Sequence, residues 1–322
     1  MPSRNFLQYL LLTAKGLAMG AADVVPGVSG GTIAFISGIY EELIETIHKL
    51  DLRFFKLWRK EGFITAWTSY NLGFLVALFG GVLISIASLA KLITWLLVAH
   101  PILIWAFFFG LILASILYVG KQIGRWNIAA FLAIAVAAAI AYFITLAEPV
   151  ASPGSTWFLF IAGFIAIIAM ILPGISGSFI LLLLGAYTTV LGIITQFSDG
   201  LASFDWELSF SAFLKLLVFI AGAVVGLKVF SRALNWMFKH YKDLTLAVLT
   251  GFMIGALNKI WPWKEVLTYR TDHKGNQVPL MEESVMPAAY EGDPQLLLAI
   301  GMIIFGFLTI FLLERISVTK QK

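Results

Sequence analysis

The chain has 322 residues and a net charge of +4; 60% of its residues are apolar and only 12% are Asp, Glu, Lys or Arg. An ordinary soluble domain carries about 25% charged residues, so this composition excludes that class and predicts a membrane protein. The absence of cysteine excludes disulfide frameworks and thiolate chemistry, and the four histidines show no paired spacing of the kind that binds a metal.

The first apolar stretch covers residues 16–40 and contains a single charged residue, Asp23. The pentapeptide Pro-Gly-Val-Ser-Gly occupies residues 26–30, near its middle. Proline lacks an amide donor and glycine reaches backbone angles that other residues avoid, so this motif predicts a helix break.

Three apolar windows follow, at residues 72–90, 101–120 and 126–147, and none of them contains a charged residue. A helix needs about 20 apolar residues to cross the hydrocarbon core of a membrane. Each window therefore predicts one full transmembrane helix.

No residue between Pro149 and Ser198 is charged, and Pro-Gly-Ile-Ser-Gly at residues 173–177 lies in the middle of this stretch. As one straight helix the stretch would be about 75 Å long, more than twice the thickness of the membrane core. We therefore expect it to fold back on itself at the motif, as a re-entrant hairpin.

Three further windows complete the chain, at residues 208–227, 244–258 and 294–313. The first is interrupted by Lys215 and the second is short, so both are weaker predictions. Together the windows predict an all-α polytopic membrane protein with about six full transmembrane helices and a loop at 261–294.

The two halves of the chain are related by an internal duplication. Eight residues around the first motif recur 147 positions later, and glycine and tryptophan residues of the following helices recur 141 positions later. We assign repeat 1 to residues 1–125, a connecting span to 126–148, repeat 2 to 149–260, and the last span and tail to 295–322.

The positions of lysine and arginine indicate the orientation of the repeats. If both motifs form re-entrant hairpins and the N-terminus is cytoplasmic, most of the 22 basic residues lie on the cytoplasmic side, as the positive-inside rule requires. The second repeat then starts on the opposite face of the membrane. We therefore expect inverted repeats, two hairpins that face each other, and both termini in the cytoplasm.

The two motif loops are the candidate site, because irregular backbone inside a membrane is tolerated only where protein or a polar cavity surrounds it. The start of a helix offers free N–H groups, and together with serine hydroxyls these suit an anion such as phosphate. The alternative is that the breaks serve close helix packing. The expected substrate-binding residues are Pro26, Gly27, Ser29, Gly30, Gly31, Thr32, Pro173, Gly174, Ser176, Gly177 and Ser178.

Four charged residues are candidates for supporting roles. Asp23 has no acidic counterpart in the second repeat, and it either couples transport to a proton or a sodium ion or caps the loop amides. Glu41 is a second coupling candidate, with a solvated interfacial position as the alternative. Lys91 and Arg232 occupy matching positions, where they either capture an anionic headgroup or act as interfacial anchors.

The run from Gly20 to Thr32, together with Gly-Ile-Tyr-Glu at residues 38–41, resembles a bacterial membrane family, the PopT-type undecaprenyl phosphate translocases. The resemblance covers nearly the whole chain. It implies a flippase that returns undecaprenyl phosphate, the carrier lipid of cell-wall synthesis, from the outer to the inner leaflet of the cytoplasmic membrane. The identity of the lipid rests on this resemblance alone, and we expect no cofactor and no nucleic-acid partner.

Two alternatives have the same architecture. One is a membrane enzyme like undecaprenyl pyrophosphate phosphatase, which has a Pro-Gly-x-Ser-Arg-Ser-Gly motif, but Gly30 and Gly177 stand where that motif has arginine. Without this arginine no bidentate clamp holds a transferring phosphoryl group. The other alternative is an ion-coupled carrier of a small soluble anion.

Overall fold

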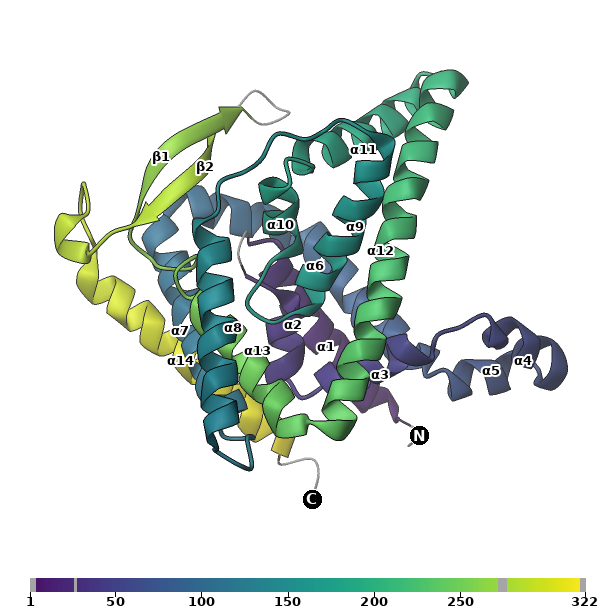
Figure 1. The fold of residues 1–322 in the computed structure, drawn as a ribbon, viewed down its shortest axis with the longest axis horizontal. Coiled ribbons are helices and arrows are strands. Elements are labelled where there is room, and N and C mark those ends of the chain that lie inside the picture. The colour runs from purple at the N-terminus through teal and green to yellow at the C-terminus, as the bar shows by residue number, and fades with distance from the viewer. Residues whose placement is uncertain (1–3, 26–27, 272–276, 319–322) are drawn as a thin grey trace.

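The computed structural model describes residues 4–25, 28–271 and 277–318, and most of them are helical (Figure 1). Pro26 and Gly27, two of the predicted site residues, lie outside the described residues. The first half contains α1 (Phe6–Asp23), α2 (Gly30–Ile36), α3 (Tyr40–Lys49), α4 (Arg53–Glu61), α5 (Phe63–Ser69), α6 (Leu72–Ala99), α7 (Pro101–Gly120) and α8 (Ile128–Leu146).

The second half repeats this order with fewer short helices. It contains α9 (Thr156–Ile171), α10 (Gly177–Leu183), α11 (Tyr187–Ala202), α12 (Trp206–His240), α13 (Lys242–Ala256), β1 (Lys264–Thr271), β2 (Gln277–Ser284), the 3-10 helix η1 (Pro287–Ala289) and α14 (Leu296–Val318).

Both motifs break the helix, as the sequence predicts. In each half a helix, α1 or α9, ends before the motif, and a seven-residue helix, α2 or α10, begins after a capping serine. Gly38 and Gly185 then end the short helices with φ values of 71° and 64°, a conformation that favours glycine. The bend between α10 and α11 is 106°.

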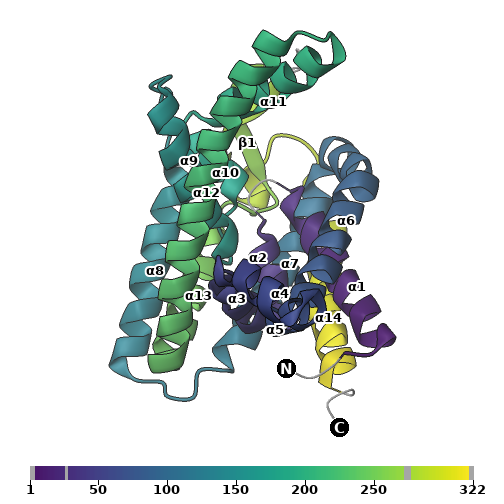
Figure 2. The same ribbon diagram turned by 90° about the vertical axis from the view of Figure 1, so that its right-hand side faces the viewer.

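Glycine lets the long helices of each half pack closely. In the first half Gly16 of α1 lies against the backbone of α6 near Leu78 and Gly81, and in the second half Gly163 of α9 lies against α12 near Phe219. Figure 2 shows α1 beside α6 and α9 beside α12. Since a Cβ atom at either glycine would collide with a backbone carbonyl, both helix pairs depend on small residues at the crossing.

Two further pairs of long helices join the two halves of the chain. Helix α7 packs along α14, with Gly110 against the backbone of Ile303, and α8 packs along α13, with Gly251 against the backbone of Ile134. These pairings tie the end of each half to the other half of the chain.

The number of long apolar helices is smaller than the sequence predicts. Within the described residues four helices are long and apolar enough to cross a membrane, namely α6, α7, α8 and α12, and a fifth is reached if the bent pair α10 and α11 counts as one span. Helix α13 has only 15 residues, and α14 enters this count only over Leu296–Phe311, the part whose side chains the structure describes. The prediction of about six full spans is therefore not confirmed in number.

The surface of the helices is that of a membrane protein. Only 17% of the apolar window of α8, and the same share of the window of α12, is buried inside the protein. Phe131, Leu132, Phe213 and Leu217 are among their exposed side chains. Outward apolar side chains along entire helices require lipid rather than water around them.

The described part of the predicted loop 261–294 contains an antiparallel hairpin of β1 and β2, in which Lys264 pairs with Ser284. The prediction of an all-α protein therefore missed two strands, because charge and hydropathy located this segment outside the membrane without testing it for alternation. The hairpin and α11 lie at one end of the molecule. At the opposite end α1 begins, α14 ends, and α12 turns into α13 (Figures 1 and 2).

Candidate functional site

Ser29 organises the start of α2. Its hydroxyl oxygen accepts a hydrogen bond from the N–H of Gly31 at 3.2 Å, which satisfies one of the free amides at the helix start. The side chain is almost fully buried, with 1% of its surface exposed. Seven residues after α1 ends, the sequence thus restarts a helix inside the protein.

The two motif loops touch each other directly. The Ser29 hydroxyl faces two carbonyl oxygens of the second loop, at 3.3 Å from Met170 and 3.2 Å from Leu172. In the reverse direction the N–H of Gly174 donates to Thr32 Oγ1 at 3.0 Å. Residues more than 140 positions apart therefore satisfy each other's polar groups.

Gly31 is required by this contact. A Cβ atom at Gly31 would lie 2.6 Å from the carbonyl oxygen of Ile171 and 3.1 Å from that of Met170. Any larger residue would push the two loops apart. Gly31, the residue directly after the first motif, therefore sets the distance between the loops.

Asp23 is the last residue of α1 and closes the first loop. Its Oδ1 atom accepts a hydrogen bond from the N–H of Gly30 at 2.7 Å. Gly30 also lies so close that a Cβ atom there would be 2.5 Å from Asp23 Oδ2. Asp23 thus caps a loop amide, which is the role expected from the sequence as the alternative to coupling with a proton or a sodium ion.

The second loop is built from Pro173, Gly174 and Ser176, all of which are buried. Ser176 caps α10, with its hydroxyl 3.5 Å from the N–H of Phe179, and lies 2.8 Å from the hydroxyl of Ser178. Gly174 has a φ of 92° and lies against the backbone of Phe252 in α13. Gly177 lies against the carbonyl of Ala166, so α10 packs tightly back onto α9.

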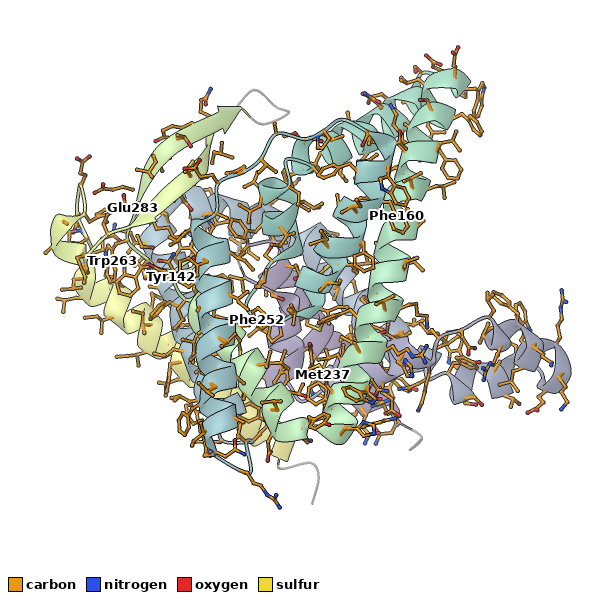
Figure 3. The ribbon with its side chains drawn as sticks, viewed as in Figure 1. Tyr142, Phe160, Met237, Phe252, Trp263 and Glu283 are labelled. Carbon is orange, nitrogen blue, oxygen red and sulfur yellow. The ribbon has the colours of Figure 1, made fainter. Side chains whose placement is uncertain are left out.

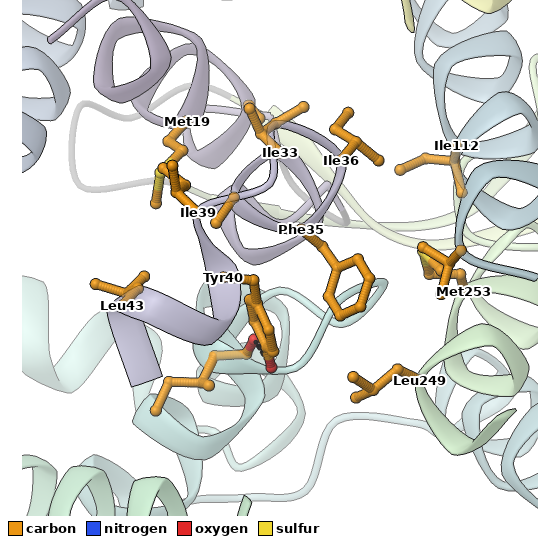
Figure 4. Packing of buried hydrophobic residues seen from close by; sticks show 14 of the residues in the cluster. Met19, Ile33, Phe35, Ile36, Ile39, Tyr40, Leu43, Ile112, Leu249 and Met253 are labelled. Carbon is orange, nitrogen blue, oxygen red and sulfur yellow. Dashed lines mark hydrogen bonds between the residues drawn. The ribbon is translucent and has the colours of Figure 1, made fainter. Parts of the chain in front are cut away.

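Tyr40 is a site residue that sequence reasoning missed. Its hydroxyl donates to the carbonyl oxygen of Ile171 at 3.1 Å, which adds a further bond between the two halves beside the second loop. Its ring packs at 4.9 Å from that of Phe35, and Figure 4 shows both rings near Leu249 of α13. The available signal was the recurrence of this tyrosine at Tyr187 in the duplication.

Lys15 was also missed. Its ammonium group donates to the carbonyl oxygen of Ser37 at 2.6 Å, at the end of α2. The lysine interrupts an apolar run, which was the signal in the sequence. It holds the far end of the first short helix against α1.

Within the described residues, no hydrogen bond or ion pair joins the motif loops to Glu41, Lys91 or Arg232. Glu41 pairs with Lys242 at 2.7 Å, and both side chains are about half exposed, so this is a surface ion pair of small energetic effect. Lys91 and Arg232 are exposed near the ends of α6 and α12. Their proposed contact with a headgroup remains a prediction.

The meeting point of the loops is polar but carries few charges. It combines hydroxyl groups, helix-start amides and one carboxylate, and in the described part of the chain no three His, Asp or Glu side chains are grouped to hold a metal ion. Such a site can accept an anion by hydrogen bonding, with Asp23 as the one fixed negative charge beside it.

These features define the class, a polytopic helical membrane protein with two helix breaks in polar contact. A family profile described as VCA0040-like, undecaprenyl phosphate translocase-like, matches residues 19–278. The chain belongs to this family, and the resemblance expected from the sequence is confirmed.

Two curated relatives support the assignment. A polyprenyl-phosphate transporter of Vibrio cholerae is 48% identical over 285 residues, which cover 88% of each chain. A polyprenyl-phosphate transporter of Staphylococcus aureus is 34% identical over 260 residues, which cover 77% of this chain and 84% of the relative. No solved structure matches the chain significantly.

Proposed function

We propose that this protein transports undecaprenyl phosphate across the bacterial cytoplasmic membrane, from the outer to the inner leaflet. The observation that carries the proposal is the direct contact between the two helix breaks, in which Ser29 at the start of α2 donates to the carbonyls of Met170 and Leu172 at the end of α9, inside a polytopic membrane protein. The curated relatives, both named polyprenyl-phosphate transporters, support the class of substrate.

The phosphate group binds between the two motif loops, with Ser29 and Ser176 on opposite sides. Both hydroxyls lie next to amides at the start of a helix, and both are buried away from water. Hydrogen bonds to an anion are stronger there than at an exposed surface. Pro26, Gly27, Gly30, Gly31, Thr32, Pro173, Gly174, Gly177 and Ser178 complete the proposed site.

The same proposal includes inverted repeats at residues 1–125 and 149–260, joined by a span at 126–148, with re-entrant hairpins at both motifs. The glycine crossings of α1 with α6 and of α9 with α12 support it, because the two halves use the same packing. Residues 261–294 then face outward, and both termini are cytoplasmic.

Transport proceeds by alternating access, and the loop contact acts as the closed gate. For a phosphate to reach Ser29 and Ser176 together, the bonds from Ser29 and Thr32 to the second loop must open. The anion replaces them with bonds of its own. Opening from one side at a time moves the headgroup between leaflets while the polyprenyl chain stays in lipid.

Asp23 is proposed to couple transport to a proton or a sodium ion. Its carboxylate caps Gly30, so it lies within the motif loop, and a fixed negative charge there would repel a phosphate. A bound cation that neutralises Asp23 removes this repulsion. Binding of the anion then favours binding of the cation, and the reverse holds equally.

A transporter fits the loops better than a phosphatase does. Gly30 and Gly177 stand where the phosphatase motif has arginine, and both are confined, Gly30 by the Asp23 carboxylate and Gly177 by the carbonyl of Ala166. Neither position has room for a guanidinium group that could clamp a phosphoryl group during its transfer.

Reconstitution into liposomes tests the function. Purified protein should move undecaprenyl phosphate between leaflets, measured as the fraction of headgroups accessible to an external reagent, and a Ser29→Ala/Ser176→Ala variant should lose most of this activity. Release of inorganic phosphate from undecaprenyl pyrophosphate would instead indicate the enzyme. Uptake of free phosphate without lipid movement would indicate the carrier of a small anion.

Labelling of introduced cysteines tests the orientation. Since the chain has no native cysteine, Ser3→Cys, Met286→Cys and Thr319→Cys each give a single site for an impermeant reagent in intact cells. The proposal expects labelling at position 286 alone. Labelling at position 3 would contradict the orientation.

A further inference from the structure

A cavity of about 350 Å³ lies between the β1–β2 hairpin and the ends of α8, α10 and α13. Figure 3 shows Tyr142 near the end of α8, below the hairpin that carries Glu283. The cavity is lined on one side by polar and charged groups, including Asn258, Lys259 and Glu282, and on the other by Leu182 and Leu183 of α10. It is therefore amphiphilic.

Two lysines share one carboxylate at the polar side. Lys259 Nζ lies 3.2 Å from Glu282 Oε2, and Lys264 Nζ lies 3.7 Å from the same oxygen. All three side chains are largely buried, with Lys264 only 7% exposed. Glu283 also lines the cavity, but its side chain is exposed. The buried cluster thus has one positive charge in excess.

This excess is costly to the folded protein and is only partly compensated. Within the described residues no acceptor lies within hydrogen-bond distance of Lys264 Nζ, which lies 3.6 Å from the centre of the Trp105 ring. Burial lowers the pKa of Lys264 to about 8, although Glu282 opposes the shift. Burial opposes ionisation of Glu282, but the two lysines outweigh it and lower the pKa of that carboxyl group.

The cavity adjoins the second motif loop. Lys259 Nζ lies 4.9 Å from the centre of the Phe179 ring, a cation–π contact. The N–H of Phe179 in turn faces the hydroxyl of Ser176, the capping residue of that loop. One aromatic residue therefore separates the buried lysine from the proposed phosphate site.

We propose that this cavity is a binding site for a phosphate monoester group, where Lys259 captures the anion and Glu282 is the internal carboxylate that it displaces. The occupant is a polyprenyl phosphate, since the leucines of α10 accept the first part of an apolar chain. The inference rests on the proposed function, in which this end of the protein faces outward and receives the lipid before the motif loops do.

Lys259 can exchange its internal partner, the Glu282 carboxylate, for a phosphate group. An ammonium group offers three N–H donors, and the Glu282 carboxylate occupies at least one of them. A phosphate dianion carries more charge than a carboxylate and offers more acceptor oxygens, so it competes for the same donors. Glu282 thereby keeps the buried lysines paired until the substrate arrives.

Two substitutions of opposite sign test the site in the full-length protein. Lys259→Gln should weaken binding of farnesyl phosphate about tenfold or more, because a charge-assisted hydrogen bond is lost. Glu282→Gln should tighten binding severalfold, because it removes the competing carboxylate. Lys56→Gln in α4, at an exposed lysine outside the cavity, is the matched control and should leave the affinity unchanged.

Affinity changes of opposite sign distinguish a binding role from a structural one. If the ion pair only stabilised the fold, both variants would bind farnesyl phosphate more weakly. Equal shifts in one direction, or no shift in either variant, would overturn the proposal. If Lys259→Gln does not fold, Lys259→Arg keeps the charge and should retain the affinity within a few-fold, while Glu282→Gln still tests the sign.

The same measurements in the Ser29→Ala/Ser176→Ala background remove the contribution of the motif loops, and the two opposite shifts should persist there. Inorganic phosphate serves as a competing probe. If inorganic phosphate competes at a concentration similar to that of farnesyl phosphate, the site recognises the phosphate group alone. If it competes only at a much higher concentration, the site also recognises the lipid chain. Both outcomes support the site. Absence of lipid transport by the unaltered protein would contradict the proposed function, whereas transport with unshifted affinities would overturn this cavity only.

Discussion

The two motif loops share a sequence pattern but have different surroundings. Every residue of α2 is buried, whereas in α10 only Gly177, Phe179 and Ile180 are buried. The first loop has a carboxylate at Asp23, and the second has Met170 at the matching position. The duplicated pattern therefore specifies the helix break, while the residues around it give each loop a separate task.

The two loops differ most clearly at matching positions of the duplication that carry different residues. Gly31 of the first loop matches Ser178 of the second; Gly31 lies against the backbone of Ile171 at the other loop, whereas the Ser178 hydroxyl lies 2.8 Å from that of Ser176 in its own loop. We infer that the first loop is the fixed partner in the core. Helix α10, which follows the second loop, lines the cavity through Phe179, Leu182 and Leu183, so we infer that the second loop is the side that exchanges contacts.

The largest effect is expected from exchanging these two residues. Gly31→Ser should destabilise the protein by about 3 kcal/mol, because its side chain must push Ile171 away and strain the loop contact. Ser178→Gly should cost only about 1 kcal/mol, since it loses one hydrogen bond to Ser176. Unfolding in detergent measures both. Equal costs would show that the loops are interchangeable.

The next effect concerns the unmatched carboxylate. Asp23→Ala should cost about 2 kcal/mol of stability, because the amide of Gly30 loses its charged acceptor, and Asp23→Asn should cost less. Coupling is read separately, from the dependence of lipid transport on pH and sodium gradients. Asp23→Asn should transport without that dependence, and a variant that keeps it would rule out coupling at Asp23.

Ser29 and Ser176 provide a smaller test of the same difference. Ser29→Ala should destabilise the fold by about 1 kcal/mol, because its hydroxyl bonds to the second loop are lost. Ser176→Ala should cost no more than that, since its partner Ser178 is local. Each should weaken binding of lipid phosphate, and the double variant should weaken it most. Unchanged binding in a folded double variant would leave the motifs with a packing role.

The smallest effect is a dependence of the free energy of unfolding on pH, caused by Lys264 in the buried cluster. Because Lys264 has a pKa of about 8 when folded and an ordinary, higher value when unfolded, the unfolded chain binds more protons between these values. The free energy of unfolding should therefore rise with pH, by about 1 kcal/mol between pH 7 and pH 9. Denaturation at several pH values measures this. Lys264→Met, the control, should abolish the rise.

Sequence patterns predicted the parts of the fold that depend on local chemistry. Apolar windows and Pro-Gly breaks located α6, α7, α8 and the two helix restarts, because length, hydropathy and backbone freedom decide these features within the segment itself. The inverted arrangement remains a proposal that rests on charge and on repeated packing.

Other features depend on partners distant in the sequence and could not be read in advance. The contact of Tyr40 with Ile171 and that of Lys259 with Glu282 exist only once the two halves and the β hairpin are in place.

The bond from Ser29 to the second loop also has a consequence for synthesis in the cell. Ser29 and its acceptor at Met170 are 141 residues apart, so at about 5 to 20 residues per second the first motif loop waits at least several seconds for its partner. During this interval its polar backbone must be protected by water or by the insertion machinery, since lipid cannot satisfy it. The first motif loop reaches its final contacts only after the second one has been synthesised, and the nascent chain should resist proteolysis from that point onward.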